Sequence, residues 1–415
     1  MKKEETESMH QLPFGVPFSI TAKAVGAACN LKCSYCYYLE KEKFYKRGSS
    51  HLMDEKTLEF FIKEYINSQP TEHVEFNWHG GETLLRPLSF YQRVIDFQKK
   101  YGQGREISNT IQTNGTLLTD EWCKFFNEYN WLVGLSIDGP QFLHDRYRKS
   151  RRGESTFSKV MNGILTLNRN RVEWNILATV NAANVDYPDQ VYNFLKSLGT
   201  PFIQFTPVVE RIKPNGMLAS GKDNDIEVAD FSVDPSKWGD FLCRVFDLWV
   251  RNDVGKIYVQ LFDATLANRL GVMPGSCTMA RECGHALAIE YNGDVYSCDH
   301  FVFPEYKLGN IKTSPIWSMV MSQCQTNFGK SKHESLPKEC LSCEHLWGCN
   351  GECLRNRFVV TNEPGKPKNY LCEGYKKFFR HVTPAFDFMK KEYEAGRPPA
   401  NIMNCYNQTD FSLNL

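Results

Sequence analysis

The sequence predicts an α/β protein, a partial (β/α)6 barrel followed by a cysteine-rich C-terminal domain. Between residues 18 and 210, short β-favouring runs alternate with stretches of helical periodicity, the pattern of βα units around a parallel sheet. Six such units are two short of a closed (β/α)8 ring, so we expect an open barrel. Nine of the 15 cysteines lie from Cys277 to Cys372, and all of them except Cys324 have partners at ligand spacing, which predicts a second domain there.

Six strands are expected in the barrel, and helical stretches separate them. The strand-like runs are Ser19–Val25, His73–Trp78, Ile107–Gln112, Trp131–Ile137, Trp174–Val180 and Phe202–Val209. The helical stretches are Glu55–Asn67, Leu88–Tyr101, Asp120–Tyr129, Thr156–Asn168 and Tyr187–Leu198. Thr119 or Asp120 is a suitable N-cap for the third helix, and Ser155 for the fourth.

Beyond the barrel, the sequence predicts a polar excursion over residues 211–235, helices over 234–254 and 263–270, and a closing helix over 378–394 before a polar tail. We therefore divide the chain into five parts. These are an N-terminal extension (1–17), the barrel (18–235), a helical connection (236–270), the cysteine-rich domain (271–380) and a C-terminal helix with its tail (381–415).

The composition is that of an ordinary globular protein, with a net charge of +1 and 42% hydrophobic residues. There is no basic field to bind nucleic acid. The N-terminal segment lacks the apolar core of a signal peptide, and no apolar run is long enough to span a membrane. We expect a cytoplasmic protein with neither nucleic acid nor a membrane as partner. In that reducing compartment, 15 cysteines indicate metal binding or catalysis rather than disulfides.

The first cysteine motif directly follows the first predicted strand. Cys29, Cys33 and Cys36 stand at offsets of zero, four and seven residues, so their thiolates can converge on one soft metal centre. Three ligands leave one corner of a four-iron cluster open, whereas a structural zinc site requires four ligands. The spacing favours an iron–sulfur cluster, and zinc remains an alternative at this point.

Other polar motifs follow the predicted strands in the same way. His79-Gly80-Gly81-Glu82 follows the second strand, residues 113–115 the third, residues 136–140 the fourth, and residues 207–210 end the sixth. Because the carboxyl ends of parallel strands share one rim of a barrel, we expect these motifs and the three cysteines to lie together there.

The opening motif, the Gly-Gly-Glu triplet and the segment Ser136-Ile-Asp-Gly-Pro140 together resemble the radical S-adenosylmethionine (SAM) superfamily. The resemblance implies that Cys29, Cys33 and Cys36 bind three irons of a [4Fe-4S] cluster and that SAM chelates the fourth. Reductive cleavage of SAM would then give a 5′-deoxyadenosyl radical, while the protein orients the reactants and excludes water.

The resemblance also assigns residues to parts of SAM. Tyr35 would hold the adenine, on which Val209 would pack, and Gln112 and Asn114 would reach the ribose. The methionine amino group would lie against Gly80, Gly81 and Glu82. Ser136 and Arg148 would hold the carboxylate, for which the forked guanidinium is well suited.

The eight later cysteines are enough for two closed four-iron clusters, with a pair of zinc sites as the alternative. Their order resembles the SPASM extension of radical SAM enzymes that modify peptides. That resemblance implies one cluster on Cys277, Cys283, Cys298 and Cys353. It implies a second on Cys340, Cys343, Cys349 and Cys372, so that the chain would carry three [4Fe-4S] clusters.

Asp299, directly after Cys298, is a candidate general base. A Cys-Asp pair at this place, and a likeness over nearly the whole chain, resemble the anaerobic sulfatase-maturating enzymes. The resemblance implies radical oxidation of a cysteine or serine in an unfolded or nascent sulfatase to Cα-formylglycine. Asp299 would take the thiol or hydroxyl proton, and an auxiliary cluster would take the second electron. His79 and Tyr38 would lie near the peptide.

A flavodoxin or ferredoxin is the expected electron donor in this family. Two other functions remain open on the sequence. One is a SPASM enzyme that forms thioether or carbon–carbon crosslinks in a peptide; the other is a non-catalytic zinc-binding interaction protein. The sequence leaves open whether serine or cysteine is the preferred target.

Overall fold

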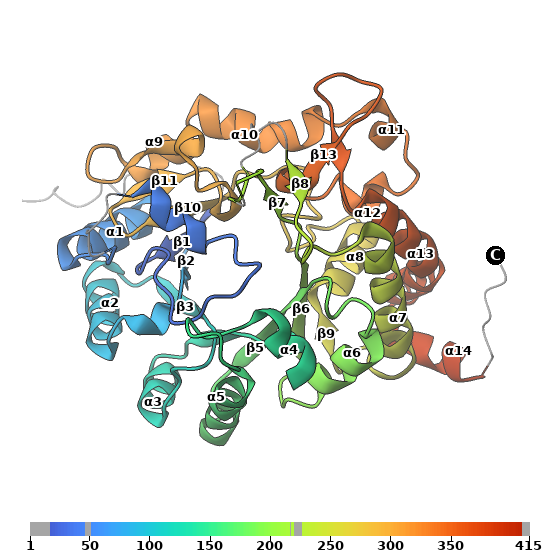
Figure 1. Cartoon of the computed structure of the whole chain (residues 1–415), viewed down its shortest axis with the longest axis horizontal. Helices are drawn as coiled ribbons and strands as arrows, with labels where there is room; N and C mark the ends of the chain where they lie inside the picture. The colour runs from blue at the N-terminus through green and yellow to red at the C-terminus, as the bar shows by residue number, and fades with distance from the viewer. Residues whose placement is uncertain (1–16, 46–50, 216, 220–225, 409–415) are drawn as a thin grey trace, which may run out of the picture.

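The computed structural model describes residues 17–45, 51–215, 217–219 and 226–408 (Figure 1). A ten-stranded sheet in the order β12-β11-β10-β1-β2-β3-β4-β5-β6-β9 organises the molecule. Nearly all of the expected N-terminal extension, and the last seven residues of the tail, lie outside the described residues.

Six parallel strands form the barrel wall that the sequence predicts. They are β1 (Ser19–Lys23), β2 (His73–Trp78), β3 (Glu106–Thr113), β4 (Leu132–Ser136), β5 (Trp174–Val180) and β6 (Phe202–Pro207). Along β5, buried residues alternate with half-buried ones, as expected when one face packs under helices. The wall is a curved, open sheet, so the predicted partial barrel is confirmed (Figure 1).

The sheet is wider than the sequence predicts, because later segments extend it at both edges. β9 (Tyr258–Val259) pairs parallel with β6, and β10 (Ala286–Glu290) pairs parallel with β1. β11 (Asp294–Tyr296) and β12 (Lys307–Asn310) continue that edge antiparallel. The cysteine-rich region is therefore joined to the barrel through one continuous sheet.

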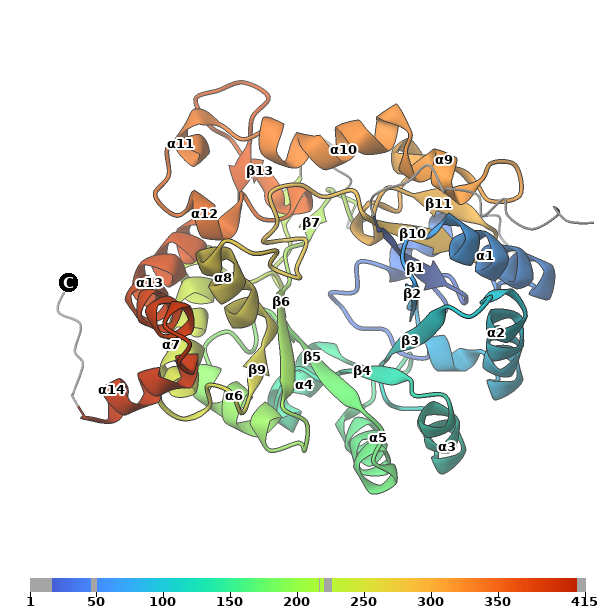
Figure 2. The same ribbon diagram turned by 180° about the vertical axis from the view of Figure 1, so that it is seen from behind.

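The helices that connect the barrel strands cover its outer side (Figures 1 and 2). They are α1 (Glu55–Ser68), α2 (Leu88–Tyr101), α3 (Asp120–Glu128), α4 (Gln141–Tyr147), α5 (Phe157–Asn170) and α6 (Pro188–Lys196). Aromatic side chains fill the layer between sheet and helices: Trp78 stacks on Trp131 and meets Tyr91 edge-on. This packing fixes the strands whose ends carry the predicted motifs.

Among the described residues, the C-terminal half adds eight α-helices, of which α7 and α13 pack together (Figure 2). They are α7 (Pro235–Asn252), α8 (Gln260–Leu270), α9 (Ile316–Val320), α10 (Gln323–Glu334), α11 (Lys338–Leu341), α12 (Leu346–Cys349), α13 (Cys372–Glu394) and α14 (Ile402–Gln408). Two small antiparallel pairs complete the fold: β7 (Arg211–Ile212) with β8 (Glu227–Val228), and β13 (Arg357–Val359) with β14 (Lys368–Asn369).

Two local expectations need correction. Thr119 caps α3 as predicted, but Ser155 does not cap α5; the helix follows Thr156, and the carboxylate of Asp145 accepts the first backbone N–H groups instead. The closing helix begins at Cys372, six residues before the expected position. None of the described helices is long and apolar enough to cross a membrane.

Candidate active site

The loop that carries the first three cysteines is fastened to the Gly-Gly-Glu turn after β2. Gly81 N donates to Gly26 O at 2.8 Å, and Glu82 N donates to Ala28 O at 2.8 Å. A Cβ atom at Gly81 would lie 1.9 Å from the carbonyl oxygen of Ala28. Only glycine permits this close approach of the two backbones, so Gly81 is required for the cysteine loop to sit where it does.

The carboxylate of Glu82 is fully buried and braces the rim. It accepts hydrogen bonds from Thr113 Oγ1 at 2.7 Å, Asn114 N at 2.7 Å and Leu84 N at 3.0 Å. Burial raises its pKa, and these donors oppose the rise. Because these three donors come from the loops after β2 and β3, the carboxylate of Glu82 links the two loops.

Tyr35 and Arg148 meet at a buried carboxylate to which sequence reasoning gave no role. Arg148 Nε lies 3.0 Å from Asp138 Oδ1, and the Tyr35 hydroxyl donates to Asp138 Oδ2. The Arg148 guanidinium also lies over the Tyr35 ring, 5.7 Å from its centroid. Asp138 thus holds both residues beside the cysteine loop, in the segment that supplied the Ser-Ile-Asp-Gly-Pro motif.

The remaining residues predicted to bind SAM also lie at the carboxyl ends of the strands. Gln112 Nε2 donates to Ser136 Oγ at 2.9 Å, which links β3 and β4. Asn114 Nδ2 donates to Asn30 Oδ1 at 2.8 Å, inside the cysteine loop. Val209 is buried two residues beyond the end of β6. The structure therefore places these predicted residues on the rim of the barrel.

The three thiols of the first motif fit a group that carries positive charge. Burial, together with the nearby Cys36 thiol, raises the pKa of Cys29 and of Cys33 to about 12. Leu31 N donates to Cys29 Sγ at 3.3 Å. Thiolates gathered in this way need a bound cation to be stable, and the irons of a cluster supply one.

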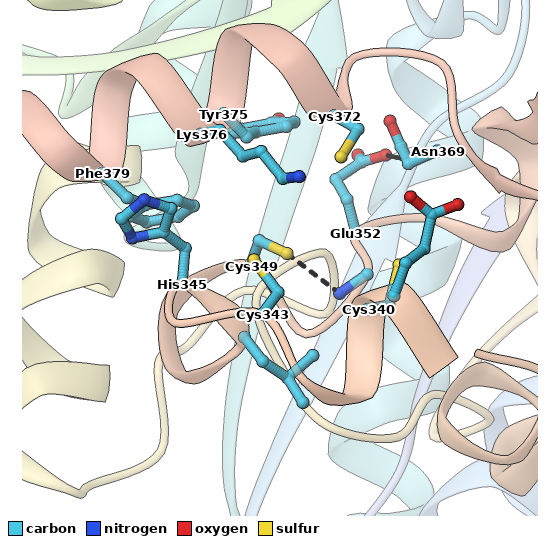
Figure 3. A pocket seen from close by; sticks show the side chains of 13 residues that line it. Cys340, Cys343, His345, Cys349, Glu352, Asn369, Cys372, Tyr375, Lys376 and Phe379 are labelled. Carbon is cyan, nitrogen blue, oxygen red and sulfur yellow. Dashed lines mark hydrogen bonds between the residues drawn. The ribbon is translucent and has the colours of Figure 1, made fainter. Parts of the chain in front are cut away.

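Four later cysteines face one another around a cavity between α11, α12 and the start of α13 (Figure 3). They are Cys340, Cys343, Cys349 and Cys372. Gly351 N donates to Cys349 Sγ at 3.2 Å, the kind of bond that stabilises a cluster thiolate. The donor set is all sulfur and surrounds an enclosed space, so these residues fit a closed four-iron cluster.

The other four cysteines also gather in one place. Cys353 and Cys277 lie near enough to Cys298 to raise the pKa of its thiol, and Cys277 raises the pKa of Cys283 in the same way. The buried Lys332 holds the Cys277 loop by donating to the carbonyl oxygens of residues 277, 278 and 280. Cys353 comes from a later segment than Cys340, Cys343 and Cys349, so the two sets interleave along the chain.

A single bound metal ion does not fit these thiols. Within the part of the chain that the structure describes, no three His, Cys, Asp or Glu side chains lie close enough to hold one ion. Zinc draws its sulfur ligands to about 2.3 Å, whereas a four-iron cluster keeps them further apart. The all-sulfur sets around open space therefore suit iron–sulfur clusters better than zinc.

Asp299 lies where the cysteine-rich region meets the barrel, between a lysine and a tyrosine. Lys23 Nζ pairs with Asp299 Oδ1, and the Tyr37 hydroxyl donates to Oδ2 at 2.6 Å. Burial alone would raise the pKa of Asp299, but the ammonium group of Lys23 outweighs it and holds that pKa well below the usual range. Asp299 is therefore ionised and oriented before any substrate arrives.

Lys23 is the centre of this cluster, and sequence reasoning missed it. Its side chain is completely buried at the end of β1, with Nζ 3.2 Å from His79 Nδ1 and 4.4 Å from the centroid of the Tyr38 ring. The signal was a lysine within the apolar run Phe18–Val25, since lysine is rarely buried without a partner.

His79 is held as a neutral ring with a defined tautomer. Its Nδ1 accepts a hydrogen bond from Gly80 N at 2.8 Å and faces Lys23 Nζ, so the ring proton must be on Nε2. Burial, reinforced by the positive charge of Lys23, lowers the pKa of His79 to about 3. The residue can therefore offer one N–H donor.

Behind Lys23 lies Glu290, its register partner on β10. The Tyr38 hydroxyl donates to one oxygen of this buried carboxylate. Burial raises the pKa of Glu290 to about 7. Tyr38, which the sequence predicts to lie near the peptide, is therefore held by Glu290 on the inner side of the site. Its neighbour Tyr37 is the tyrosine that contacts Asp299.

Arg355, two residues after Cys353, ties the cysteine-rich region to the end of β6. Its guanidinium pairs with the buried Glu210 and lies 4.9 Å from the centroid of the Tyr37 ring. His300 packs edge-on against the same ring, at 5.1 Å. Tyr37 thus fills the space between the first cysteine motif and the Cys298–Cys353 pair.

Two protein families match the chain. The Radical SAM superfamily matches residues 24–195, and the SPASM iron-sulfur cluster-binding domain matches residues 277–344. Fold and site together thus define a radical SAM enzyme with an iron–sulfur cluster-binding C-terminal domain. SAM and [4Fe-4S] clusters are its cofactors.

Comparison with individual proteins gives the family. The chain is 56% identical over 397 residues to the serine-type anaerobic sulfatase-maturating enzyme of Bacteroides thetaiotaomicron, covering 94% of this chain and 95% of that protein. It is 34% identical to the cysteine-type enzyme of Clostridium novyi, covering 90% and 97%. The solved structure of native anSMEcpe with bound AdoMet and a Cp18Cys peptide superimposes with a TM-score of 0.80, at 31% identity, covering 91% of this chain and all of that one.

The chain belongs to the anaerobic sulfatase-maturating enzymes. It is a radical SAM oxidoreductase that generates formylglycine. The superfamily and family expected from the sequence are therefore confirmed.

Proposed function

We propose that this enzyme oxidises a serine in an unfolded or nascent sulfatase segment to Cα-formylglycine. Serine is proposed as the target rather than cysteine because the chain is 56% identical to a serine-type enzyme and 34% identical to a cysteine-type one. Because its substrate is a newly made chain and its thiols must stay reduced, we place it in the cytoplasm. Its electrons come from a flavodoxin or ferredoxin.

The proposed ligands are the three cysteine sets described above, and the proposed SAM-binding residues are those of the rim. The SAM-binding residues are Tyr35, Gly81, Glu82, Ser136, Arg148 and Val209. Held by these residues, SAM and its cluster would supply a radical able to take one hydrogen atom from the serine β-carbon, and the auxiliary clusters would supply an acceptor for the remaining electron.

Asp299 acts as general base and takes the serine hydroxyl proton. A carboxylate with a lowered pKa is too weak a base for an ordinary alcohol. The hydroxyl becomes much more acidic once the adjacent carbon carries an unpaired electron, so proton transfer to Asp299 follows hydrogen-atom removal. Lys23 and Tyr37 keep the carboxylate ionised and oriented for that moment.

His79 donates its Nε2–H to the substrate and so positions the reacting segment. Support comes from the fixed tautomer, because a neutral imidazole that accepts at Nδ1 has one donor left. Loss of the β-hydrogen, the hydroxyl proton and one electron accounts for the aldehyde product. A crosslinking enzyme would instead join two residues of its peptide.

Two peptides that differ only in serine or cysteine at the target position test this proposal. The reconstituted holoenzyme, SAM and a chemical reductant should convert the serine peptide with loss of two hydrogen atoms, and with a higher kcat/KM than the cysteine peptide. A preference for cysteine would refute the proposed specificity, and a crosslinked product would refute the reaction.

A further inference from the structure

The surface outside the first cysteine motif carries an excess of unneutralised positive charge. Residues 147–152 run antiparallel to residues 29–34, with Lys32 N donating to Lys149 O at 2.8 Å and a bridge between Leu31 and Ser150. This loop and its neighbours present five half-exposed or exposed cationic side chains. They are Lys32, Arg146, Lys149, Arg151 and Arg152, here called the basic face.

The five charges of the basic face are unpaired and lie close together in space, and four of them are also close in the chain. Several exposed cations elsewhere pair with carboxylates, for example Arg169 with Asp120 and Lys237 with Asp186. None of the five cations of the basic face forms an ion pair with any residue that the structure describes. On a chain with a net charge of only +1, five unpaired cations in one place are a strong local field.

Two nearby carboxylates, Asp145 and Glu154, reduce the positive charge of the face but do not cancel it. Asp145 accepts from the Ser155 hydroxyl and from the first backbone N–H groups of α5. Glu154 accepts from the Ser150 hydroxyl at 3.2 Å. Five positive and two negative side chains leave a clear positive excess.

The basic face is also joined to the ligand loop itself. Arg151 Nε donates to the carbonyl oxygen of Cys29 at 2.6 Å, and Ser34 N donates to Tyr147 O at 3.2 Å. Cys29 and Cys33 are both partly exposed. A protein bound on this face would therefore lie directly over the residues that we propose hold the SAM-cleaving cluster.

We propose that the basic face is the docking surface for an acidic one-electron carrier protein. The proposal rests on the proposed function, because only an enzyme with a cluster on Cys29, Cys33 and Cys36 needs an electron at this place. Complementary charge speeds the encounter and orients the carrier over the cluster loop. The sulfatase segment has no such need of this face, since its reacting serine must reach Asp299 inside the barrel.

The test compares a protein reductant with a chemical one. The reconstituted holoenzyme is assayed with the serine peptide, reduced either by a flavodoxin with its reductase or by dithionite. In the variant R146E/R152E, the flavodoxin-driven rate at low salt should fall at least about tenfold, while the dithionite-driven rate stays unchanged. The milder R146Q/R152Q should fall between the variant and the wild type.

Binding supplies a second readout, independent of turnover. The Kd of the holoenzyme for the flavodoxin should weaken in R146E/R152E, and the difference from wild type should shrink at high ionic strength. The matched control is K256E/K330E, which makes the same change in net charge through two exposed lysines outside the basic face.

Three results would overturn the proposal: an equal loss in K256E/K330E, no loss with flavodoxin, or an equal loss with dithionite. A raised KM for the peptide under dithionite would assign the face to the substrate instead. Failure of the proposed function looks different, because the wild-type enzyme with dithionite would then leave the serine peptide unchanged.

Discussion

At the scale of single residues, Lys23 is the residue on which the catalytic cluster depends. Its ammonium group joins Asp299, His79 and the Tyr38 ring from a fully buried position. Without it, Asp299 would carry an uncompensated charge, and His79 would lose one of the two contacts at Nδ1. Lys23 thus holds both the proposed general base, Asp299, and the proposed hydrogen-bond donor, His79, in position.

Replacement of Lys23 by methionine should therefore lower formylglycine formation by about 10²-fold, with SAM cleavage continuing without product. Lys23→Arg, which keeps the charge, should retain more activity. The double variant K23M/D299N should be no slower than D299N alone, because both changes remove the same interaction. Independent, multiplying losses would show that Lys23 does not act through Asp299.

Glu290 makes stability depend on pH. Burial raises its pKa from 4.5 to about 7, so the folded state binds this proton more tightly than the unfolded chain. The stabilisation is complete below pH 4.5, declines as pH rises towards 7, and amounts to on the order of 3 kcal/mol.

Glu290→Gln should remove that decline. Thermal unfolding of the variant and the wild type should give Tm values that diverge in favour of the variant as pH rises from 4.5 to about 7. Glu128→Gln, at an exposed position, should show no such divergence. A constant difference between Glu290→Gln and wild type across this range would contradict the account.

At the scale of elements, the strand ends and the loops after them could be predicted, but the contacts between loops could not. β2, α2 and β5 have the predicted bounds, because a strong period and clear end signals coincide there. α13 begins earlier than predicted: Gly374 is a poor helix former, but it packs against Gly239 of α7. That tertiary contact is invisible in the local sequence.

The glycine turn after β2 is the element on which the cysteine loop rests. Gly81→Ala would place a methyl group 1.9 Å from the Ala28 carbonyl oxygen, so the two backbones must separate. We expect the variant to lose the SAM-cleaving cluster and all SAM cleavage, with the iron of the auxiliary clusters retained. Retention of full SAM cleavage would show that the contact is not required.

At the scale of the whole molecule, the cysteine-rich region completes the barrel. β10 pairs with β1 and brings Asp299 to Lys23, while Arg355 pairs with Glu210 beyond β6. The sequence predicted the two regions and their motifs. The pairing of β10 with β1 could not be predicted from the sequence. A strand as short as β10 resembles many other apolar runs, and its partner lies more than 250 residues away in the chain.

The second auxiliary set should stabilise this closure. Cys349→Ala should remove about four of about twelve irons and lower the Tm of the holoenzyme, because loops of the cysteine-rich region lose their common anchor. The matched change Cys324→Ala, at an exposed cysteine outside all three sets, should alter neither the iron content nor the Tm. Equal effects of the two substitutions would argue against the proposed ligand assignment.

The central claim is that the serine β-carbon first loses a hydrogen atom to the SAM-derived radical and that Asp299 then takes the hydroxyl proton. The most direct measurement uses a peptide whose serine carries deuterium on the β-carbon, with wild-type enzyme and Asp299→Asn compared for label in 5′-deoxyadenosine and for aldehyde. The account predicts deuterium transfer in both, and aldehyde formation reduced by about 10²–10⁴-fold in the variant. Aldehyde formed by Asp299→Asn at the wild-type rate, with normal cluster content, would contradict it.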